Sequence, residues 1–224
     1  MRRFNVLAVC LGLLAAVGTA VATADPPTQK SNPNFVQPKL VGRASDAGGF
    51  ALSEAKLKEL FPDYQWNERE LAYIKDHLER GDSRAAIVAS VKPLVVSAYS
   101  DELDAVILIA FPERLVEKYS LHDGDQLIVS WTYPRAQGVP GDIVQGERNL
   151  GRYNNGQPLI ADFISDSADA LKARKSVVTD KEWERVKALT PPAMKRADGK
   201  YRSAFPLYSH VPPELLTKDI PTAQ

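Results

Sequence analysis

The sequence predicts a single α+β domain with N-terminal helices, a sheet of about four strands, C-terminal helices and a Pro-rich extended tail. The chain has 224 residues, of which 44% are hydrophobic, so it is long enough to bury a core. Apolar residues recur at helical spacing near both ends of the domain, whereas runs rich in Val, Ile and aromatic residues lie between them. We expect residues 51–190 to form the globular domain.

Residues 1–24 have the pattern of a signal peptide. Arg2 and Arg3 precede a long apolar run, and Ala22 and Ala24 supply the small residues that a signal peptidase requires. Cleavage would export the chain to the periplasm or out of the cell, while an uncleaved N-terminal anchor is the alternative. No later stretch approaches the roughly 18 apolar residues of a membrane span, so we expect a soluble mature protein.

Charge and cysteine content exclude several classes of function. The chain has 28 Lys and Arg against 28 Asp and Glu, a balance that excludes a polybasic nucleic-acid binder. Cleavage also removes the only cysteine, Cys10, so the mature chain has no disulfide, thiolate metal site or cysteine nucleophile. Residues 25–50 are rich in Pro and Gly, which predicts a flexible leader or tether.

Three helices are predicted before the sheet. The second has Asn67 as its N-cap and Glu70 three residues later, the spacing of a capping box. His77 lies opposite the apolar stripe of that helix, so we expect a partly exposed packing residue. The three predicted helices are Ser53–Leu60, Asn67–Gly81 and Ser83–Ser90.

Strands and further helices follow. Runs of strand length predict strands at Leu94–Ala98, Ala105–Phe111, Gln126–Tyr133 and Leu159–Ile164. Helical spacing and capping signals predict helices at Pro112–Tyr119, Ser165–Lys175 and Thr179–Leu189. The tail, 191–224, contains six prolines and is expected to run extended over the domain, held by Tyr201, Phe205 and Tyr208.

The segment Pro134–Gln157 is the most unusual part of the sequence. A connection of 24 residues is long for a compact domain, and such loops are usually functional or disordered. Five glycines allow close approach of the backbone, and arginine binds carboxylate or phosphate in a bidentate manner. The alternative is a structural loop. The predicted ligand-binding residues are Arg148, Asn149, Arg152, Tyr153 and Asn155.

Other candidate chemistry is sparser. His122 with Asp123 or Asp125 on a turn would suit a hydrolase in which the imidazole is the general base. Acidic residues at the same strand ends, Asp101, Glu102 and Asp104, lack the spacing of a calcium-binding loop, so we expect no metal site. No catalytic motif or dinucleotide-binding fingerprint occurs, and we expect no cofactor.

One local resemblance spans 101–125. The segment contains, in order, Asp101-Glu102-Leu103, a strand, Pro112-Glu113-Arg114-Leu115, a short helix, and Leu121-His122-Asp123-Gly124-Asp125. This order is similar to that of swapped-hairpin DNA-binding folds of the AbrB and antitoxin type. That family presents basic residues to phosphates, but between 98 and 133 only Arg114 and Lys118 are positive. DNA binding is therefore not transferred to this chain.

The sequence alone leaves two functional hypotheses from different classes. The leading one is an exported, non-catalytic envelope protein that binds a protein partner or a small anionic ligand through the Gly-, Arg- and Asn-rich loop. The alternative is an envelope hydrolase that uses His122 with Asp123 or Asp125. Neither hypothesis identifies the ligand or the substrate.

Overall fold

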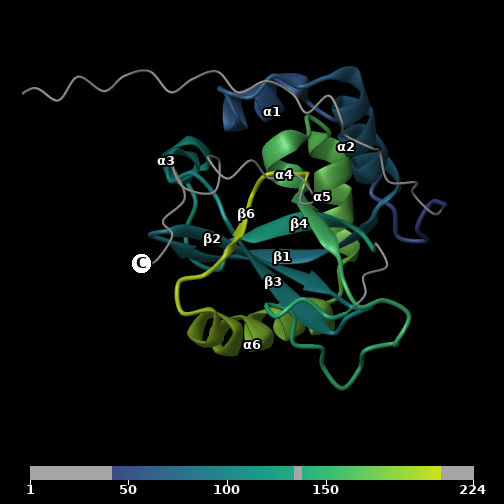
Figure 1. Ribbon diagram of the computed structural model, residues 1–224, viewed down its shortest axis with the longest axis vertical. Coiled ribbons are helices and arrows are strands. Elements are labelled where there is room, and N and C mark those ends of the chain that lie inside the picture. Colours follow the sequence, from purple (N-terminus) through teal and green to yellow (C-terminus); the bar gives the residue numbers. More distant parts are fainter. Residues whose placement is uncertain (1–41, 134–137, 208–224) are drawn as a thin grey trace, which may run out of the picture.

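A computed structural model describes residues 42–133 and 138–207, which form a curled six-stranded sheet covered by helices on both faces (Figure 1). The helices are α1 (Glu54–Leu60), α2 (Glu68–Arg80), α3 (Arg114–Tyr119), α4 (Ala161–Ile164), α5 (Ala168–Val177) and α6 (Asp180–Ala197). The strands are β1 (Asp82–Val91), β2 (Leu94–Ser100), β3 (Ala105–Ala110), β4 (Gln126–Thr132), β5 (Gln157–Ile160) and β6 (Arg202–Ser203). None of these helices is long and apolar enough to cross a membrane.

Strand β1 lies near the centre of the sheet, whose order is β5-β4-β1-β2-β3-β6. The first five strands pair antiparallel, and β6 adds to β3 in parallel. Helix α6 packs across β1, β2 and β3 on one face, while α2, α4 and α5 pack against β4 on the other (Figure 1). The side chains of β2 and β3 are buried along their whole length, as expected for strands covered on both faces.

The mixed α+β class is confirmed, but the sheet has six strands rather than about four. The helix predicted at Ser83–Ser90 is wrong, because these residues belong to β1. Small and β-branched residues such as Ala86 and Val88 fit between two neighbouring strands, and pairing with both β2 and β4 outweighs local helical spacing. The strand predicted at Leu159–Ile164 ends at Ile160, where α4 follows.

The tail is helical where we expected it to be extended. Helix α6 continues through Pro191 and Pro192 to Ala197, and both prolines lie on its exposed side. Beyond it Phe205 is fully buried and stacks on Trp66, with ring centroids 5.4 Å apart, so the predicted anchoring by Phe205 is confirmed. The expectation for Tyr208 lies outside the described residues.

His77 is fully buried rather than partly exposed. Helix α2 packs against β4, so the side that lies opposite its apolar stripe is covered as well. The Nε2 atom lies 2.9 Å from the Ser130 carbonyl oxygen, and burial lowers the pKa of the imidazole to about 4. The neutral histidine therefore has a packing role between helix and sheet.

Candidate functional site

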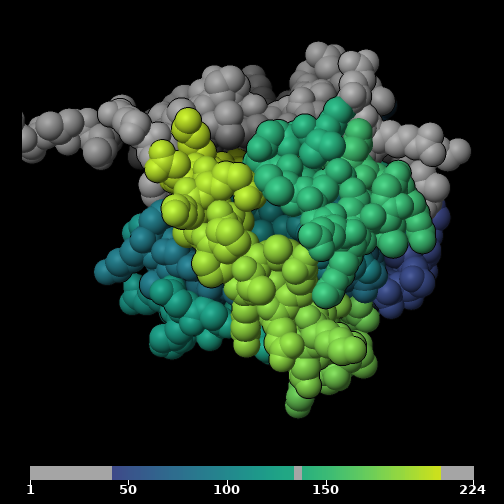
Figure 2. Space-filling view, turned by 90° about the horizontal axis from the view of Figure 1, so that it is seen from below, coloured from purple at the N-terminus to yellow at the C-terminus, as the bar shows by residue number. Residues whose placement is uncertain are grey.

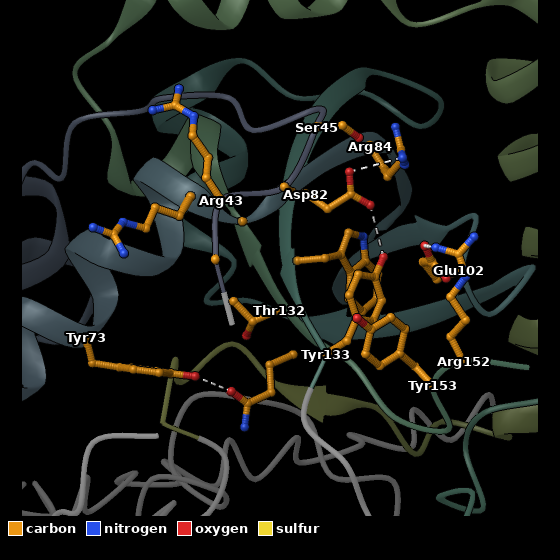
Figure 3. A pocket seen from close by; sticks show the side chains of 16 residues that line it. Arg43, Ser45, Tyr73, Asp82, Arg84, Glu102, Thr132, Tyr133, Arg152 and Tyr153 are labelled. Carbon is orange, nitrogen blue, oxygen red and sulfur yellow. Dashed lines mark hydrogen bonds and ion pairs between the residues drawn. The ribbon is translucent and has the colours of Figure 1, made fainter. Parts of the chain in front are cut away.

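A cavity of about 340 Å³ opens where β1 begins and β4 ends, beside the C-terminus of α2 (Figure 3). We call it the main cavity. Its wall comes from segments far apart in the sequence, namely 42–45, 80–84, 131–133 and 152–157, together with Tyr73 and Glu102. Its volume lies at the lower end of the range of small-molecule sites, roughly 300–1,000 Å³. The cavity therefore suits a small ligand rather than a polymer segment.

Three aromatic rings form a column in the wall. Trp131 and Tyr133 stack with centroids 6.0 Å apart, and Tyr133 and Tyr153 stack at 4.8 Å. The indole N–H of Trp131 donates to the Tyr99 carbonyl oxygen at 2.7 Å, which fixes the inner ring. Gly156 allows the 152–157 segment to lie against this ring, because a Cβ there would be 2.8 Å from the indole. The column gives the cavity an apolar wall of fixed orientation.

Arg84 lies at the inner end of the cavity and is surrounded by carboxylates. Its guanidinium lies 3.0 Å from Asp46, 3.0 Å from Asp82 and 2.8 Å from Asp101. Arg174 of α5 lies 3.8 Å from Asp46 and donates to the Ser83 carbonyl oxygen at 2.6 Å. The alternation of β1 places Asp82 and Arg84 on one face of the strand, next to each other. Arg84 therefore holds Asp82 at the cavity wall.

Asp82 is the most perturbed acid of the site. Its residue is 6% exposed, and burial raises the pKa of its carboxyl to about 7, with smaller contributions from the negative charges of Asp101 and Asp46. Arg84 opposes this shift. The Tyr133 hydroxyl lies 3.3 Å from Asp82 Oδ2 and 3.0 Å from the Ser100 hydroxyl. Perturbed acids in cavities are common at functional sites.

Two arginines at the mouth of the cavity have no close carboxylate partner among the described residues. Within the described residues Arg43 forms no ion pair, and Arg152 approaches Glu102 only at 3.7 Å with a side chain 66% exposed. Arg80 is paired with Asp76 of the same helix at 2.9 Å. Figure 3 shows Arg43 and Tyr73 on one side of the cavity, and Glu102, Arg152 and Tyr153 on the other. The two arginines therefore flank the cavity from opposite sides.

Of the five residues predicted to bind a ligand, the structure brings two to the main cavity, Arg152 and Tyr153. The other three do not line it. The Arg148 backbone N–H donates to Asp104 Oδ2 at 3.1 Å. The side-chain oxygens of Asn149 and Asn155 accept backbone N–H groups of Gly151 and Gly156, each at 2.8 Å. These asparagines therefore shape the loop that carries Arg152 and Tyr153.

His122 lies on an exposed turn and is not part of the cavity wall. Its side chain is 81% exposed, and Nδ1 is 3.7 Å from Asp125. The carboxylate of Asp125 accepts the His122 backbone N–H at 2.8 Å, and that of Asp123 accepts the Val91 backbone N–H at 2.9 Å. Asp125 therefore closes the turn, and Asp123 joins it to the end of β1.

The three acidic residues Asp101, Glu102 and Asp104 lie in three different environments. Asp101 pairs with Arg84, Glu102 lines the cavity, and Asp104 is buried beneath the loop. Asp104 accepts from Arg185 at 2.9 and 2.6 Å, in addition to the Arg148 N–H. In the described part of the chain, no group of three or more His, Cys, Asp or Glu residues is arranged to hold a metal ion.

Sequence reasoning missed Arg43, Asp82, Arg84 and Tyr133. Their only signal was the alternation of Asp82 and Arg84, which gives the two side chains a shared face in a strand; the helix we predicted began at Ser83 and left Asp82 out. Comparisons with protein-family models, curated proteins and solved structures found no match to this chain.

Proposed function

We propose that this protein binds a small anionic ligand in the main cavity. One observation carries the proposal: the cavity combines a stacked aromatic wall with two arginines, Arg43 and Arg152, whose charges the fold leaves largely unused. A concave site with an apolar wall and a few convergent polar groups is the usual form of a small-molecule site. An arginine at the mouth of a cavity attracts carboxylate or phosphate.

The aromatic column supports a ligand with an apolar or planar part. Tyr153 is the outermost ring of the column, and it belongs to the same loop as Arg152. One loop would thus supply both the charge contact and the apolar contact. Binding without chemistry needs no further group, and the exposed turn of His122 contributes nothing to this cavity.

We also propose that the protein acts outside the cytoplasm. The basis is the sequence of residues 1–24, with its two arginines, apolar run and small-residue cleavage site. The mature chain begins at Asp25 in this proposal, and the ligand is a small anion of the cell envelope or its surroundings. The alternative form of this proposal is that the protein binds a protein partner at the envelope.

The test is a thermal-shift screen of residues 25–224 with phosphate, acetate, citrate, benzoate, galacturonate and phenylalanine. A ligand at 100 times its dissociation constant stabilises the folded state by about 2.7 kcal/mol, which is a measurable rise in melting temperature. We expect Arg43→Ala and Arg152→Ala to abolish the shift. Arg148→Ala is the matched control from the same loop, since its exposed side chain lies outside the cavity. A shift that Arg148→Ala removes and Arg152→Ala retains would refute the assignment.

A further inference from the structure

Among the described residues, the wall of the main cavity contains four arginines but only two carboxylates. Two of the arginines are paired with acids of the fold: Arg84 contacts three aspartates, and Arg80 pairs with Asp76 at 2.9 Å. The other two are Arg43 and Arg152, and in the described part of the chain neither guanidinium donates a hydrogen bond. The capacity of the wall to bind anions therefore lies at these two side chains.

These two arginines approach the cavity from different directions. Figure 3 shows Arg43 and Arg152 on opposite sides of the cavity, with Asp82 and Tyr133 between them in this view. Exposed arginines are usually solvated, but these two flank one concave site. One anionic group at either arginine leaves the other without a partner. A ligand with an anionic group at each end would give both guanidinium groups the bidentate contact that they form with carboxylates.

The middle of the cavity is unsuited to a negative charge. Asp82 lies in the wall between the two arginines, and its carboxylate repels an anion whenever it is ionised. Beside it the rings of Tyr133 and Tyr153 stack with centroids 4.8 Å apart, and an uncharged planar group can lie against them. The wall thus suits a ligand that is anionic at both ends and apolar between them.

We infer that the ligand is a dicarboxylate with an apolar or planar centre, whose two carboxylates are held by Arg43 and Arg152. This inference rests on the proposed function and specifies its ligand class. A monocarboxylate contacts only one of the two arginines, so the second carboxylate should add one charge-assisted contact. Such a contact changes a dissociation constant about tenfold or more. A phosphate monoester has a similar charge at one end only and should lack this gain.

Diacids and their monomethyl esters separate one anionic contact from two. Terephthalate and the longer 1,4-phenylenediacetate carry a carboxylate at each end, and each monomethyl ester has nearly the same shape with one charge removed. We expect calorimetric titration of residues 25–224 to show that at least one of these diacids binds about ten times more tightly than its own ester. Phthalate, whose carboxylates are adjacent on the ring, should bind no more tightly than the esters. Equal affinity of both diacids and their esters, or a phthalate affinity equal to that of the tighter diacid, would overturn the inference.

Variants of each arginine test the two contacts separately. Arg43→Ala and Arg152→Ala should each lower the affinity for the tighter diacid about tenfold, because one of its two anionic contacts is lost. Arg148→Ala, from the loop of Arg152 but outside the cavity wall, is the matched control and should keep the wild-type affinity. An effect of only one of the two cavity arginines would overturn the inference. Absence of binding by both diacids would overturn it too, while a thermal shift with another anion that depends on Arg152 would leave the proposed function standing.

Discussion

At the scale of single residues, buried charges determine both the stability of the domain and the chemistry of the cavity. Asp104 and Asp82 each contact an arginine and a tyrosine, but their electrostatic situations are opposite. Asp104 is fully buried and receives three hydrogen bonds from Arg185 and the Arg148 backbone. Asp82 has one arginine, Arg84, which it shares with two other carboxylates.

Replacement of Asp104 should be strongly destabilising. The variant Asp104→Asn keeps the shape of the side chain but leaves Arg185 without its carboxylate partner, and we expect a loss of about 3–5 kcal/mol in the free energy of unfolding. Glu184→Gln, an exposed acid one residue before Arg185, is the control and should change stability by less than about 0.5 kcal/mol. Urea denaturation measures both. Equal stability of the two variants would show that the Asp104 network contributes nothing.

Because of Asp104, we also expect the folded state to lose stability in acid. Burial alone raises the pKa of its carboxyl, but hydrogen bonds from Arg185 and the Arg148 N–H lower it below its usual value overall. The unfolded chain then binds the proton more tightly than the folded one, so this contribution is present above about pH 4 and is lost as the pH falls further. In Asp104→Asn the decline of stability below about pH 4 should be shallower than in the wild type.

For Asp82 we expect the opposite dependence, a loss of folding stability as the pH rises. Because its folded pKa of about 7 exceeds the unfolded value of about 3.9, the folded state binds the proton more tightly, and stability falls as the pH rises from about 4 to about 7. Asp82→Asn removes this loss. The stability of the variant relative to the wild type should therefore be higher at pH 8 than at pH 5 by at least about 1 kcal/mol. A constant difference in urea denaturation would contradict the raised pKa.

The sequence could predict only part of the site at this scale. Arg152 and Tyr153 stand out because they belong to a long loop rich in glycine and asparagine. Arg43 and Tyr133 have no local signal, since their places in the cavity wall depend on segments that meet only in the folded chain. His77 shows the same limit: its buried position depends on β4, which lies far from α2 in the sequence.

At the scale of elements, helix starts were predictable because their signals are local. The capping box at Asn67 is present, with the Asn67 side chain 3.0 Å from the Glu70 N–H and Glu70 3.0 Å from the Asn67 N–H. The Thr179 hydroxyl oxygen accepts the Glu182 N–H at 3.3 Å and caps α6, but Glu182 accepts the Ala85 N–H, so no capping box forms there. Strand β1 was not predictable, because its identity depends on non-local pairing with β2 and β4.

Loss of the α2 cap should weaken the element that carries Tyr73 and Arg80 to the cavity. Asn67→Ala removes the acceptor for the Glu70 N–H, and we expect a loss of about 1 kcal/mol in the free energy of unfolding. Asn67→Asp retains the acceptor and should remain within about 0.5 kcal/mol of the wild type. Thermal and urea denaturation compare the two. A loss of the same size in both variants would point to a contact other than the cap.

At the scale of the whole molecule, the fold brings both ends of the described chain to one core. Phe205 packs in an edge-to-face manner on Phe61 and Tyr64, with ring centroids 5.2 and 4.9 Å apart, so the chain after α6 closes over the N-terminal helices. On the face seen in Figure 2, α6 and the segment that follows it lie beside the 138–153 loop. The ion pair of Arg202 in β6 with Asp142 joins this loop to the segment that follows α6.

Export makes a prediction for the whole chain. Expressed with residues 1–24 in a bacterium, the protein should be recovered outside the cytoplasm with Asp25 as its first residue, because signal peptidase cleaves after small residues. Ala24→Trp should block this cleavage and retain the apolar segment. N-terminal sequencing of the recovered protein decides the question. A chain that still begins at Met1 would favour an N-terminal anchor.

The central claim is that the main cavity binds a small acid, and the most direct test is to locate the bound molecule by NMR. We would titrate the ¹⁵N-labelled chain 25–224 with each small acid of the thermal-shift panel and follow the backbone amides. The account predicts saturable shifts at Gly81, Thr132 and Tyr153, which line the cavity, with little change at His122 or Lys200. Saturable shifts centred on the His122 turn, or no saturable shift anywhere, would contradict it.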